Sequence, residues 1–526
     1  MNAKEIAGVF TEMAALLELT GANPFRARAY QNVARALEGV TEDIETLVRE
    51  DRLGEVSGVG KGLAASIAEL VTTGSLKDYD ELREKVPDGV LEILELPGLG
   101  PKRVRRIWEE LGVTNIGELE YACRENRLAA LDGFGEKTQT NVLKAIAFRV
   151  QGRDRHLYHR ARAAADAVLE LVKSQPGVIR VEIAGSLRRH RETIGDLDIL
   201  ASASDDARPG IMDAFVKNDD IVDVIAHGST KSSVRLKSGI NADLRVVSDE
   251  EFPFALAYFT GSKEHNTVLR GRAKREGLKL NEYGLFRENS DTIPCENETN
   301  LYRALGLPYI PPELRENMGE FEAAERNELP DLVTMDDIRG ILHVHTVRSD
   351  GVHTVEQLVQ AAKTLGAEYL GIADHSRSAF YAGGLSENDV RAQWDEIDEV
   401  NERIDDITVL KGIESDILSD GGLDYNDELL AGFDFVIASV HSRLHMTEDE
   451  ATERLLRAID HPATTILGHP TGRLLLARDG YLVDMQRVIE RCVERGVAIE
   501  LNASPHRLDL DWRWCRNVRE HGGVIA

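Results

Sequence analysis

Three aspartates near the middle of the sequence have the residue type and spacing of a metal site. Asp196 and Asp198 alternate with apolar residues in the run DLDILASA, and Asp243 lies in a second such run, NADLRVV. Residues i and i+2 of a β-strand project to the same face, so the first two carboxylates share one side of a sheet. If Asp243 lies on a neighbouring strand, the three carboxylates can hold two divalent cations, because hard cations prefer oxygen ligands. The pattern therefore predicts a two-metal site for chemistry on phosphate groups.

A short stretch before the aspartates, IAGSLRRHRETIG, supplies groups that match phosphate oxygens. Gly185 and Ser186 offer a tight turn with a hydroxyl and free amides, and Arg189 offers a planar fork of N–H donors. An exposed strand edge with alternating charges would explain Asp-x-Asp alone, but it does not explain the turn and the third aspartate. The remaining basic residues of the stretch are expected to be exposed at the surface; they are Arg188, His190 and Arg191.

A second group of residues with metal-binding chemistry lies in the later half of the sequence. Five histidines and two carboxylates occur in the motifs HVHT, SDG, ADHS, GIESD, SVHS and GHPTGR, each next to a strand-like run. The ends of successive strands in a barrel-like fold converge at one rim, so these side chains are expected to meet. Imidazole and carboxylate together suit zinc, manganese or iron. The residues are His343, His345, Asp350, His375, Glu414, His441 and His469.

Three glycine-rich turns recur in the first 150 residues, each just before a predicted helix. They are VSGVGKG (56–62), LPGLGPK (96–102) and LDGFGEK (131–137). Paired glycines let backbone N–H groups approach an anion, and the following helix adds its positive N-terminal end. One such turn alone would also fit a helix C-cap, but the repetition favours phosphate binding. The glycines are Gly58, Gly60, Gly98, Gly100, Gly133 and Gly135.

The composition changes along the chain, which indicates several domains. Residues 1–150 read as short helices, and β-branched runs dominate from residue 176 before helical segments follow. The acidic stretch 316–333 contains Pro330 and lacks a clear apolar period, which indicates a linker. After it, strand-like runs alternate with helical stretches, which is typical of a parallel, barrel-like sheet. A chain of this length is expected to hold about three to five domains.

The net charge of −28 argues against a uniformly basic surface for nucleic acid. Basic residues still cluster locally in RVRR (103–106), RRHR (188–191) and RGRAKR (270–275). An acidic surface around basic working faces is expected in a salt-rich cytoplasm and predicts a haloarchaeal origin. The sequence has no apolar run of the roughly 18 residues that a membrane span needs. The four cysteines lack the spacing of a disulfide framework or a thiolate zinc site.

The segment YFTGSKEHNTVLR (258–270) resembles the thumb signature of the family X DNA polymerases, and the Gly-Ser turn before the aspartates resembles their nucleotidyltransferase site. The glycine turns resemble helix-hairpin-helix motifs, which hold the DNA backbone without reading sequence. The resemblance implies in-line attack of a primer 3′ hydroxyl on an α-phosphate, with Mg²⁺ or Mn²⁺. It implies metal ligation by Asp196, Asp198 and Asp243, nucleotide contacts by Gly185, Ser186, Arg189, Gly195, Tyr258, Phe259 and Gly261, and minor-groove contacts by Asn266 and Arg270.

One position departs from the family X pattern. In VSGVGKGLAASI, Ser66 stands where the sugar-phosphate lyase of the family uses a lysine, and a hydroxyl cannot form the required Schiff base. Lyase activity by that route is therefore not expected, unless the nearby Lys61 substitutes.

The later half of the sequence resembles the polymerase-and-histidinol-phosphatase (PHP) family of multinuclear metal phosphoesterases. The resemblance implies hydrolysis of phosphate esters by a metal-bound hydroxide, with Zn²⁺, Mn²⁺ or Fe²⁺. The family pattern ends with a further aspartate and histidine, and the sequence stops at GGVIA (522–526) before them, so a truncated chain is expected. The implied ligands are His343, His345 and Glu414 for one metal, Glu414, His441 and His469 for a second, and Asp350 with His375 for a third.

Together the resemblances predict a multidomain fold. It consists of an α-helical helix-hairpin-helix region, an α+β nucleotidyltransferase palm with a thumb, and a distorted α/β (β/α)7-type PHP barrel. The expected domains are an N-terminal helical DNA-binding domain (1–88), a fingers-like helix-hairpin-helix region (89–150), the palm (151–252), the thumb (253–317), a linker (318–335) and the PHP domain (336–526).

The predicted function is the filling of short gaps in base excision repair, with 3′-5′ exonuclease activity in the PHP domain. Two alternatives stay open: a PHP phosphoesterase or nuclease whose front half only binds DNA, and a template-independent nucleotidyltransferase. A non-catalytic scaffold fits the motifs least well. The expected partners are gapped or primed duplex DNA and deoxynucleoside triphosphates, and we expect a cytoplasmic monomer with no membrane partner.

Overall fold

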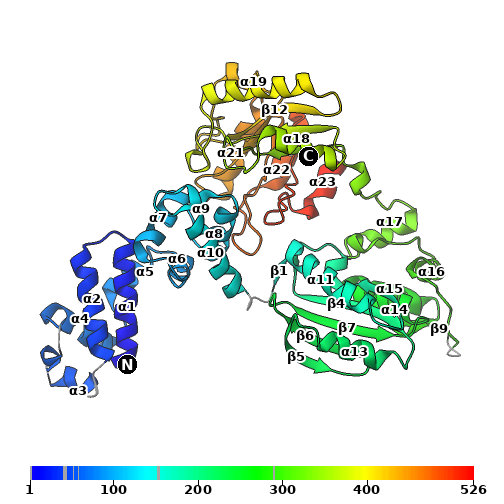
Figure 1. Cartoon of the computed structure of the whole chain (residues 1–526), viewed down its shortest axis with the longest axis horizontal. Helices are drawn as coiled ribbons and strands as arrows, with labels where there is room; N and C mark the ends of the chain where they lie inside the picture. The colour runs from blue at the N-terminus through cyan, green and yellow to red at the C-terminus, as the bar shows by residue number, and fades with distance from the viewer. Residues whose placement is uncertain (1–2, 39–43, 51, 57–58, 151–154, 288–290) are drawn as a thin grey trace. The chain divides into compact units, whose positions relative to one another are not determined.

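The computed structural model describes residues 3–38, 44–50, 52–56, 59–150, 155–287 and 291–526, and Figure 1 labels its helices and strands. The chain divides into two compact units. The first unit holds residues 1–147, 345–354 and 374–390, and the second holds residues 148–344, 355–373 and 391–526. Within the described ranges, no helix is both long and apolar enough to cross a membrane.

The N-terminal part of the first unit consists of helices, as the sequence predicts. α1 (Ala3–Leu19) and α2 (Pro24–Glu38) pack against each other, and Phe10 and Leu37 are fully buried in their shared core. Apolar residues at helical spacing bury one face of each helix. The other helices are α3 (Ile44–Arg49), α4 (Lys61–Thr73), α5 (Lys77–Arg83), α6 (Asp88–Leu94), α7 (Pro101–Leu111), α8 (Ile116–Arg124), α9 (Arg127–Ala130) and α10 (Gly135–Val150).

A five-stranded sheet with the order β2-β4-β7-β6-β5 forms the palm in the second unit. Its strands are β2 (Val178–Ile183), β4 (Asp196–Ala203), β5 (Ile221–His227), β6 (Lys231–Leu236) and β7 (Asn241–Val247). β4 and β7 are parallel, and the other neighbouring pairs are antiparallel. All five strands coincide with the β-branched runs of the sequence, which confirms the predicted α+β class.

The two faces of the palm sheet are covered differently. Leu197 and Ile199 of β4 lie in the core with α11 (Tyr158–Lys173) and α13 (Arg208–Val216). Leu200 lies in a separate cluster with α14 (Phe252–Thr260). Because side chains alternate along a strand, Asp196 and Asp198 project to the face that Leu200 shares with α14. The palm is completed by α12 (Gly185–Arg188) and the short pair β1 (His156–Leu157) and β3 (Thr193–Ile194).

The thumb follows α14 and has a core of its own. It comprises α15 (Lys263–Arg275), the hairpin of β8 (Leu278–Asn281) and β9 (Gly284–Arg287), and α16 (Glu298–Ala304). One more helix, α17 (Glu320–Arg326), lies inside the predicted linker, and its residues Phe321 and Ala324 belong to the thumb core. The sequence signal for this helix was weak because Phe321 and Ala324 are the apolar residues that mark its buried face.

A parallel sheet forms the core of the PHP domain. Its described strands follow chain order as β10 (Gly340–Val344), β11 (Tyr369–Ile372), β12 (Thr408–Asp416), β13 (Phe435–Ser439), β14 (Ile466–Leu467) and β15 (Ala498–Ile499). A single parallel bridge from Ile499 to Ile525 continues this order beyond β15. The connecting helices are α18 (Val355–Thr364), α19 (Glu387–Arg403), α20 (Asp427–Leu430), α21 (Glu448–Asp460), α22 (Met485–Arg495) and α23 (Cys515–Glu520). The predicted strand-helix alternation is confirmed, since helices lie between successive strands. Parallel strands need such long crossover connections.

Candidate nucleotide and metal sites

The three palm aspartates meet because β4 and β7 pair in parallel. Asp198 lies directly opposite Asp243 in the register, and Asp196 lies opposite Asn241. The Gly-Ser turn comes against the same carboxylates, since a Cβ on Gly185 would lie 2.2 Å from Asp198 Oδ2. Gly185 also has a positive φ of 63°, which glycine adopts without strain. The turn and the aspartates therefore form one site on the α14 side of the sheet.

The palm site concentrates negative charge in a half-buried place. Burial, together with the neighbouring Asp196 and Asp243, raises the pKa of Asp198 to about 7. Lys231 offsets part of this charge, since its Nζ lies 2.5 Å from Asp243 Oδ2, and Arg245 also favours the ionised form of Asp198. Three crowded carboxylates with one raised pKa match divalent cations, which take oxygen ligands. The donor set thus fits the predicted metal ions.

The guanidinium of Arg189 contacts other protein groups, which phosphate binding alone would not predict. Its Nε donates to Glu316 Oε1 at 2.8 Å, and its Nη1 donates to the carbonyl oxygen of Thr260. The guanidinium also lies beside Gly261, whose absent Cβ would be 3.1 Å from Nη1. With 13% of its side chain exposed, Arg189 joins the nucleotide turn to the end of α14. Its contact with a triphosphate stays a prediction.

The expectation of surface exposure was wrong for Arg188. Its guanidinium donates to Glu298 Oε2 at 2.6 Å and to Thr260 Oγ1 at 2.7 Å. Glu298 also accepts from Arg315, which is completely buried. The sequence could not show this pairing, because Glu298 lies 110 residues further along the chain. Arg191 is likewise only 24% exposed and lies beside Glu316, whereas His190 is 54% exposed as expected.

The thumb residues of the predicted site lie around the junction of α14 and α15. The Nδ2 of Asn266 donates to the carbonyl oxygen of Tyr258 at 2.7 Å, so the side chain of Asn266 lies next to the backbone of Tyr258. The rings of Tyr258 and Phe259 pack edge to face with centroids 5.2 Å apart, and Arg245 of β7 lies 4.2 Å over the Phe259 ring. Arg270 is exposed, one turn further along α15. These contacts place the aromatic pair beside the strand that carries Asp243.

The glycine turns of the first unit each precede a helix, as predicted. Gly60 and Gly100 are the N-cap residues of α4 and α7, and Gly135 opens α10. Gly98 and Gly133 have positive φ angles of 87° and 75°, which L side chains rarely adopt. Gly58 lies outside the described residues. The turns therefore present helix N-termini with small residues in front of them, which is an arrangement suited to phosphate.

The position of the expected lyase nucleophile lies on α4. Ser66 is exposed, and its hydroxyl donates to the carbonyl oxygen of Gly62 at 3.3 Å within the same helix. Lys61, the first residue of α4, is also exposed. The absence of lyase activity by this route stays a prediction.

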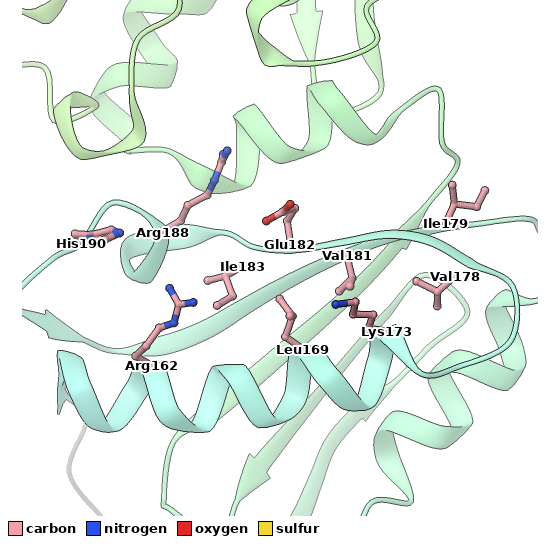
Figure 2. A pocket seen from close by; sticks show the side chains of 10 residues that line it. All are labelled: Arg162, Leu169, Lys173, Val178, Ile179, Val181, Glu182, Ile183, Arg188 and His190. Atoms are coloured by element: carbon pink, nitrogen blue, oxygen red, sulfur yellow. The ribbon is translucent and has the colours of Figure 1, made fainter. Parts of the chain in front are cut away.

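A pocket of about 500 Å³ lies on the palm between α11 and the edge strand β2. Figure 2 shows Arg162 and Lys173 from α11 beside Val181 and Ile183 from β2. The three aspartates, Ser186 and Arg189 are not among its lining residues. The pocket is therefore not the predicted nucleotide site.

In the PHP domain, three of the predicted histidines in the second unit converge on one carboxylate oxygen of Glu414. Glu414 Oε1 lies 3.1 Å from His343 Nε2, 3.1 Å from His441 Nε2 and 2.9 Å from His469 Nε2. The residues come from β10 and β12 and from the segments that follow β13 and β14. The carboxyl ends of parallel strands meet at one edge of the sheet, which explains the convergence.

This cluster has the donor set of a metal site. His469 Nδ1 is buried and, in the described part of the chain, has no hydrogen-bond partner. Burial and nearby Arg507 lower the pKa of His469 to about 4, which keeps its imidazole neutral and able to bind a metal. Burial opposes protonation of His343 as well, but Glu500 and Glu414 raise its pKa to about 10. A divalent cation would displace that proton and balance the carboxylates.

The other predicted PHP residues form a cluster in the first unit. His345 Nδ1 lies 2.9 Å from Asp350 Oδ1, and His375 Nε2 lies 3.4 Å from Asp350 Oδ2. Burial would raise the pKa of Asp350, but the hydrogen bonds from His345 and His375 hold it well below its usual range. The ligand atoms of these three residues lie within 4.8 Å of one another. Two imidazoles around a carboxylate again suit a transition metal.

Two carboxylates of the PHP domain were missed by sequence reasoning. Glu500 lies 2.5 Å from His343 Nδ1, and Asp416 lies 2.6 Å from His441 Nδ1. Both had a signal in the sequence, since Asp416 is at i+2 from Glu414 in GIESD and Glu500 follows an apolar run in VAIELNA. Their partners, however, are far away in the chain.

Comparison with protein families agrees with this geometry. The chain matches the DNA polymerase beta thumb over residues 255–316 and the PHP domain over residues 342–504. It also matches a helix-hairpin-helix domain over residues 1–76 and a SAM-like helix-hairpin-helix tandem over residues 90–147. The matches confirm the helix-hairpin-helix, thumb and PHP parts of the predicted fold.

Individual relatives extend these matches to the whole chain. A probable phosphatase of Clostridium acetobutylicum is 32% identical over 172 residues, which are 31% of this chain and 63% of that protein. DNA polymerase lambda of Rattus norvegicus is 26% identical over 323 residues, which are 56% of this chain and 52% of that protein. The DNA polymerase/3′-5′ exonuclease PolX of Bacillus subtilis is 36% identical over 531 residues, covering 100% of this chain and 92% of that protein. Because this likeness spans palm, thumb and PHP domain together, the chain belongs to the family X DNA polymerases.

Proposed function

We propose that this chain is a DNA polymerase that fills short gaps during DNA repair, and that its PHP domain removes nucleotides from 3′ ends. The observation that carries the first part is the parallel register that sets Asp198 opposite Asp243 beside the Gly185 turn. A nucleotidyl transferase needs metal-holding carboxylates next to a phosphate-binding turn, and the palm has both. The relatives from Bacillus subtilis and Rattus norvegicus are both named as DNA polymerases.

In the polymerase reaction, Asp196, Asp198 and Asp243 would hold two Mg²⁺ or Mn²⁺ ions. When bound, such ions would supply the charge that activates the primer 3′ hydroxyl and stabilises the leaving pyrophosphate. The Gly185 and Ser186 turn, with Gly195 and Arg189, would bind the outer phosphates.

The thumb residues would select and align the nucleotide. The edge-to-face pair of Tyr258 and Phe259 would line its sugar, with Gly261 allowing close approach. Asn266, which Tyr258 holds in place, and the exposed Arg270 would contact the minor-groove edges of the nascent pair and template. Such contacts require a paired template base, so they favour template-directed synthesis over random addition.

In the PHP domain, Glu414, His343, His441 and His469 would hold Zn²⁺, Mn²⁺ or Fe²⁺, and His345, Asp350 and His375 would hold a further ion. A metal of this kind supplies a nucleophilic water at neutral pH. The scissile bond would be the phosphodiester at a primer 3′ end. The helix-hairpin-helix turns with Gly58, Gly60, Gly98, Gly100, Gly133 and Gly135 would hold the DNA backbone.

The proposal extends to the binding partners, the location and the oligomeric state of the protein. The proposed partners are gapped or primed duplex DNA and deoxynucleoside triphosphates, and we propose a cytoplasmic monomer. The net charge of −28 supports adaptation to a salt-rich cytoplasm, where high charge maintains solubility.

A gapped duplex with a labelled primer tests both activities in one tube. We expect Asp243→Ala to lose extension and keep 3′ trimming, and Glu414→Ala to lose trimming and keep extension. Asp205→Ala is the control, because this palm carboxylate is 90% exposed and outside the site. Extension by Asp243→Ala at the wild-type rate would contradict the assignment of Asp243 as a metal ligand of the polymerase site.

The same assay separates the alternatives. Trimming without any extension by the wild-type chain would show a hydrolase whose palm only binds DNA. Extension that is indifferent to the template base would show a template-independent nucleotidyltransferase. DNA binding with neither activity would show a scaffold.

A further inference from the structure

Two imidazoles of the PHP cluster each lie between an inner and an outer carboxylate. The inner carboxylate is shared, since His343 Nε2 and His441 Nε2 both lie 3.1 Å from Glu414 Oε1. The outer carboxylates differ. His343 Nδ1 lies 2.5 Å from Glu500 Oε1, and His441 Nδ1 lies 2.6 Å from Asp416 Oδ1. The same arrangement therefore occurs twice around Glu414.

The outer carboxylate of Glu500 is fully engaged by protein donors. Its Oε2 accepts the backbone N–H of His469 at 2.6 Å, and its Oε1 also accepts from Asn502 Nδ2 at 3.3 Å. The residue is 6% exposed. Because donors occupy both oxygens, Glu500 is oriented toward the histidines and not toward an open coordination position. It contacts the side chain of one candidate ligand and the backbone of another.

The fold brings these carboxylates to the histidines from two strands. Glu414 and Asp416 are at i and i+2 on β12, so both project to one face of the sheet. Glu500 directly follows β15 and reaches the chain segment after β14 at the backbone N–H of His469. A Cβ at the preceding residue, Gly468, would lie 2.3 Å from Ser439 Oγ at the end of β13, so the glycine lets the side chains of the neighbouring strand approach closely.

We propose that Glu500 and Asp416 are positioning residues for the PHP metal ions: each accepts the Nδ1–H of a histidine and directs that histidine's Nε2 to the metal. This inference rests on the proposed PHP metal site. The physical basis is that a histidine carries one proton when it binds a metal, and a hydrogen bond to one nitrogen decides which nitrogen is free. An outer carboxylate also makes the imidazole a stronger donor and fixes its ring orientation.

The test measures metal binding directly, in a chain whose palm aspartates are replaced (Asp198→Asn, Asp243→Asn) so that only PHP binding is counted. Calorimetric titration with Mn²⁺ compares this chain with versions that add Glu500→Gln or Asp416→Asn, which keep side-chain shape and remove the charge. We expect each addition to weaken Mn²⁺ binding by about 10- to 100-fold. Glu490→Gln on the exposed face of α22 is the matched control, with unchanged affinity expected.

Two further measurements separate positioning from folding and from the metal site itself. Thermal unfolding in chelator should show that every variant is folded at the temperature of the titration, and the visible spectrum of bound Co²⁺ should change in Glu500→Gln and Asp416→Asn, because the ligand orientation changes. Unchanged Mn²⁺ affinity and Co²⁺ spectrum in both variants, with binding lost in Glu414→Ala, would overturn the positioning role alone. Wild-type affinity in Glu414→Ala would instead overturn the proposed metal site.

Discussion

Asp198 on β4 lies directly opposite Asp243 on β7, in the parallel pair of the palm sheet. With Asp196 two residues away on the same face, three carboxylates share one half-buried site. Burial and these neighbours raise the pKa of Asp198 to about 7. The arrangement that suits two divalent cations is therefore unfavourable for the protein alone.

We predict that Asp198→Asn abolishes primer extension and stabilises the protein in chelator at pH 8. A carboxyl whose folded pKa is raised binds a proton more tightly in the folded state, so stability falls as pH rises from about 4 to about 7, by about 1.4 kcal/mol for each pKa unit. Asparagine has no such dependence. Thermal unfolding at pH 8 and pH 5 should show a larger gain at pH 8. At pH 8, a melting temperature of Asp198→Asn equal to or below that of the wild type would show that repulsion among the three carboxylates does not destabilise the fold.

We predict that Glu298→Ala destabilises the protein by about 3–5 kcal/mol, because it leaves Arg315 and Arg188 without their shared carboxylate. Arg315 is completely buried, and Glu298 is 6% exposed. The control is Glu328→Ala, since Glu328 pairs with Arg326 at the surface, where an ion pair contributes little. Urea unfolding measures both variants. A loss no larger than that of the control would show that the pair does not hold the palm to the thumb.

We predict that the thumb loses stability on acidification through His265. This buried histidine lies 2.8 Å from Glu320 Oε1 and 2.8 Å from the Tyr302 hydroxyl, and its ring stacks on Phe321. Burial lowers the pKa of His265, although the Glu320 hydrogen bond opposes the shift. A group with a lowered folded pKa takes up its proton more readily when unfolded, so stability falls as pH drops below about 6.5.

Hydrogen exchange of the α15 and α17 amides, corrected for intrinsic rates, tests this dependence at pH 7.5 and pH 5.5. Protection should fall at pH 5.5 in the wild type and change less in His265→Gln. His190→Gln, at an exposed position, should behave as the wild type. An identical pH response in His265→Gln would assign the effect to other groups.

We predict that alanine substitution at two glycines of one hairpin turn affects different properties, namely stability at Gly98 and DNA binding at Gly100. Gly98 has a φ of 87°, so Gly98→Ala should destabilise the first unit by about 1 kcal/mol or more. Gly100 has a φ of −86° and open space around its Cβ position, so Gly100→Ala should leave folding intact. If this turn binds the DNA backbone, the added methyl group of Gly100→Ala should still weaken binding to gapped duplex.

Circular dichroism melting and DNA titration at fixed salt measure the two effects separately. Gly8→Ala inside α1, where the Cβ position is also open, serves as a helix control outside the three turns. Full DNA affinity in Gly100→Ala would remove this turn from the proposed DNA contacts.

Much of the fold and of both sites could be predicted from local sequence patterns. The alternation around Asp196 and Asp198 predicted a strand with both carboxylates on one face, and β4 has that geometry. The strand-helix alternation after residue 340 predicted a parallel sheet with histidines at strand ends, which β10 to β15 show. These patterns are readable because side-chain direction repeats every two residues in a strand and every 3.6 in a helix.

Partner choice between distant segments was decided only by the tertiary structure. Arg188 pairs with Glu298, 110 residues away, and His343 pairs with Glu500, 157 residues away. Arg189, which the motif assigns to phosphate, is held by Glu316 of the thumb. Residue type and periodicity set which way a side chain points along its own element. Which group it meets depends on how strands and helices pack, and no local pattern carries that information.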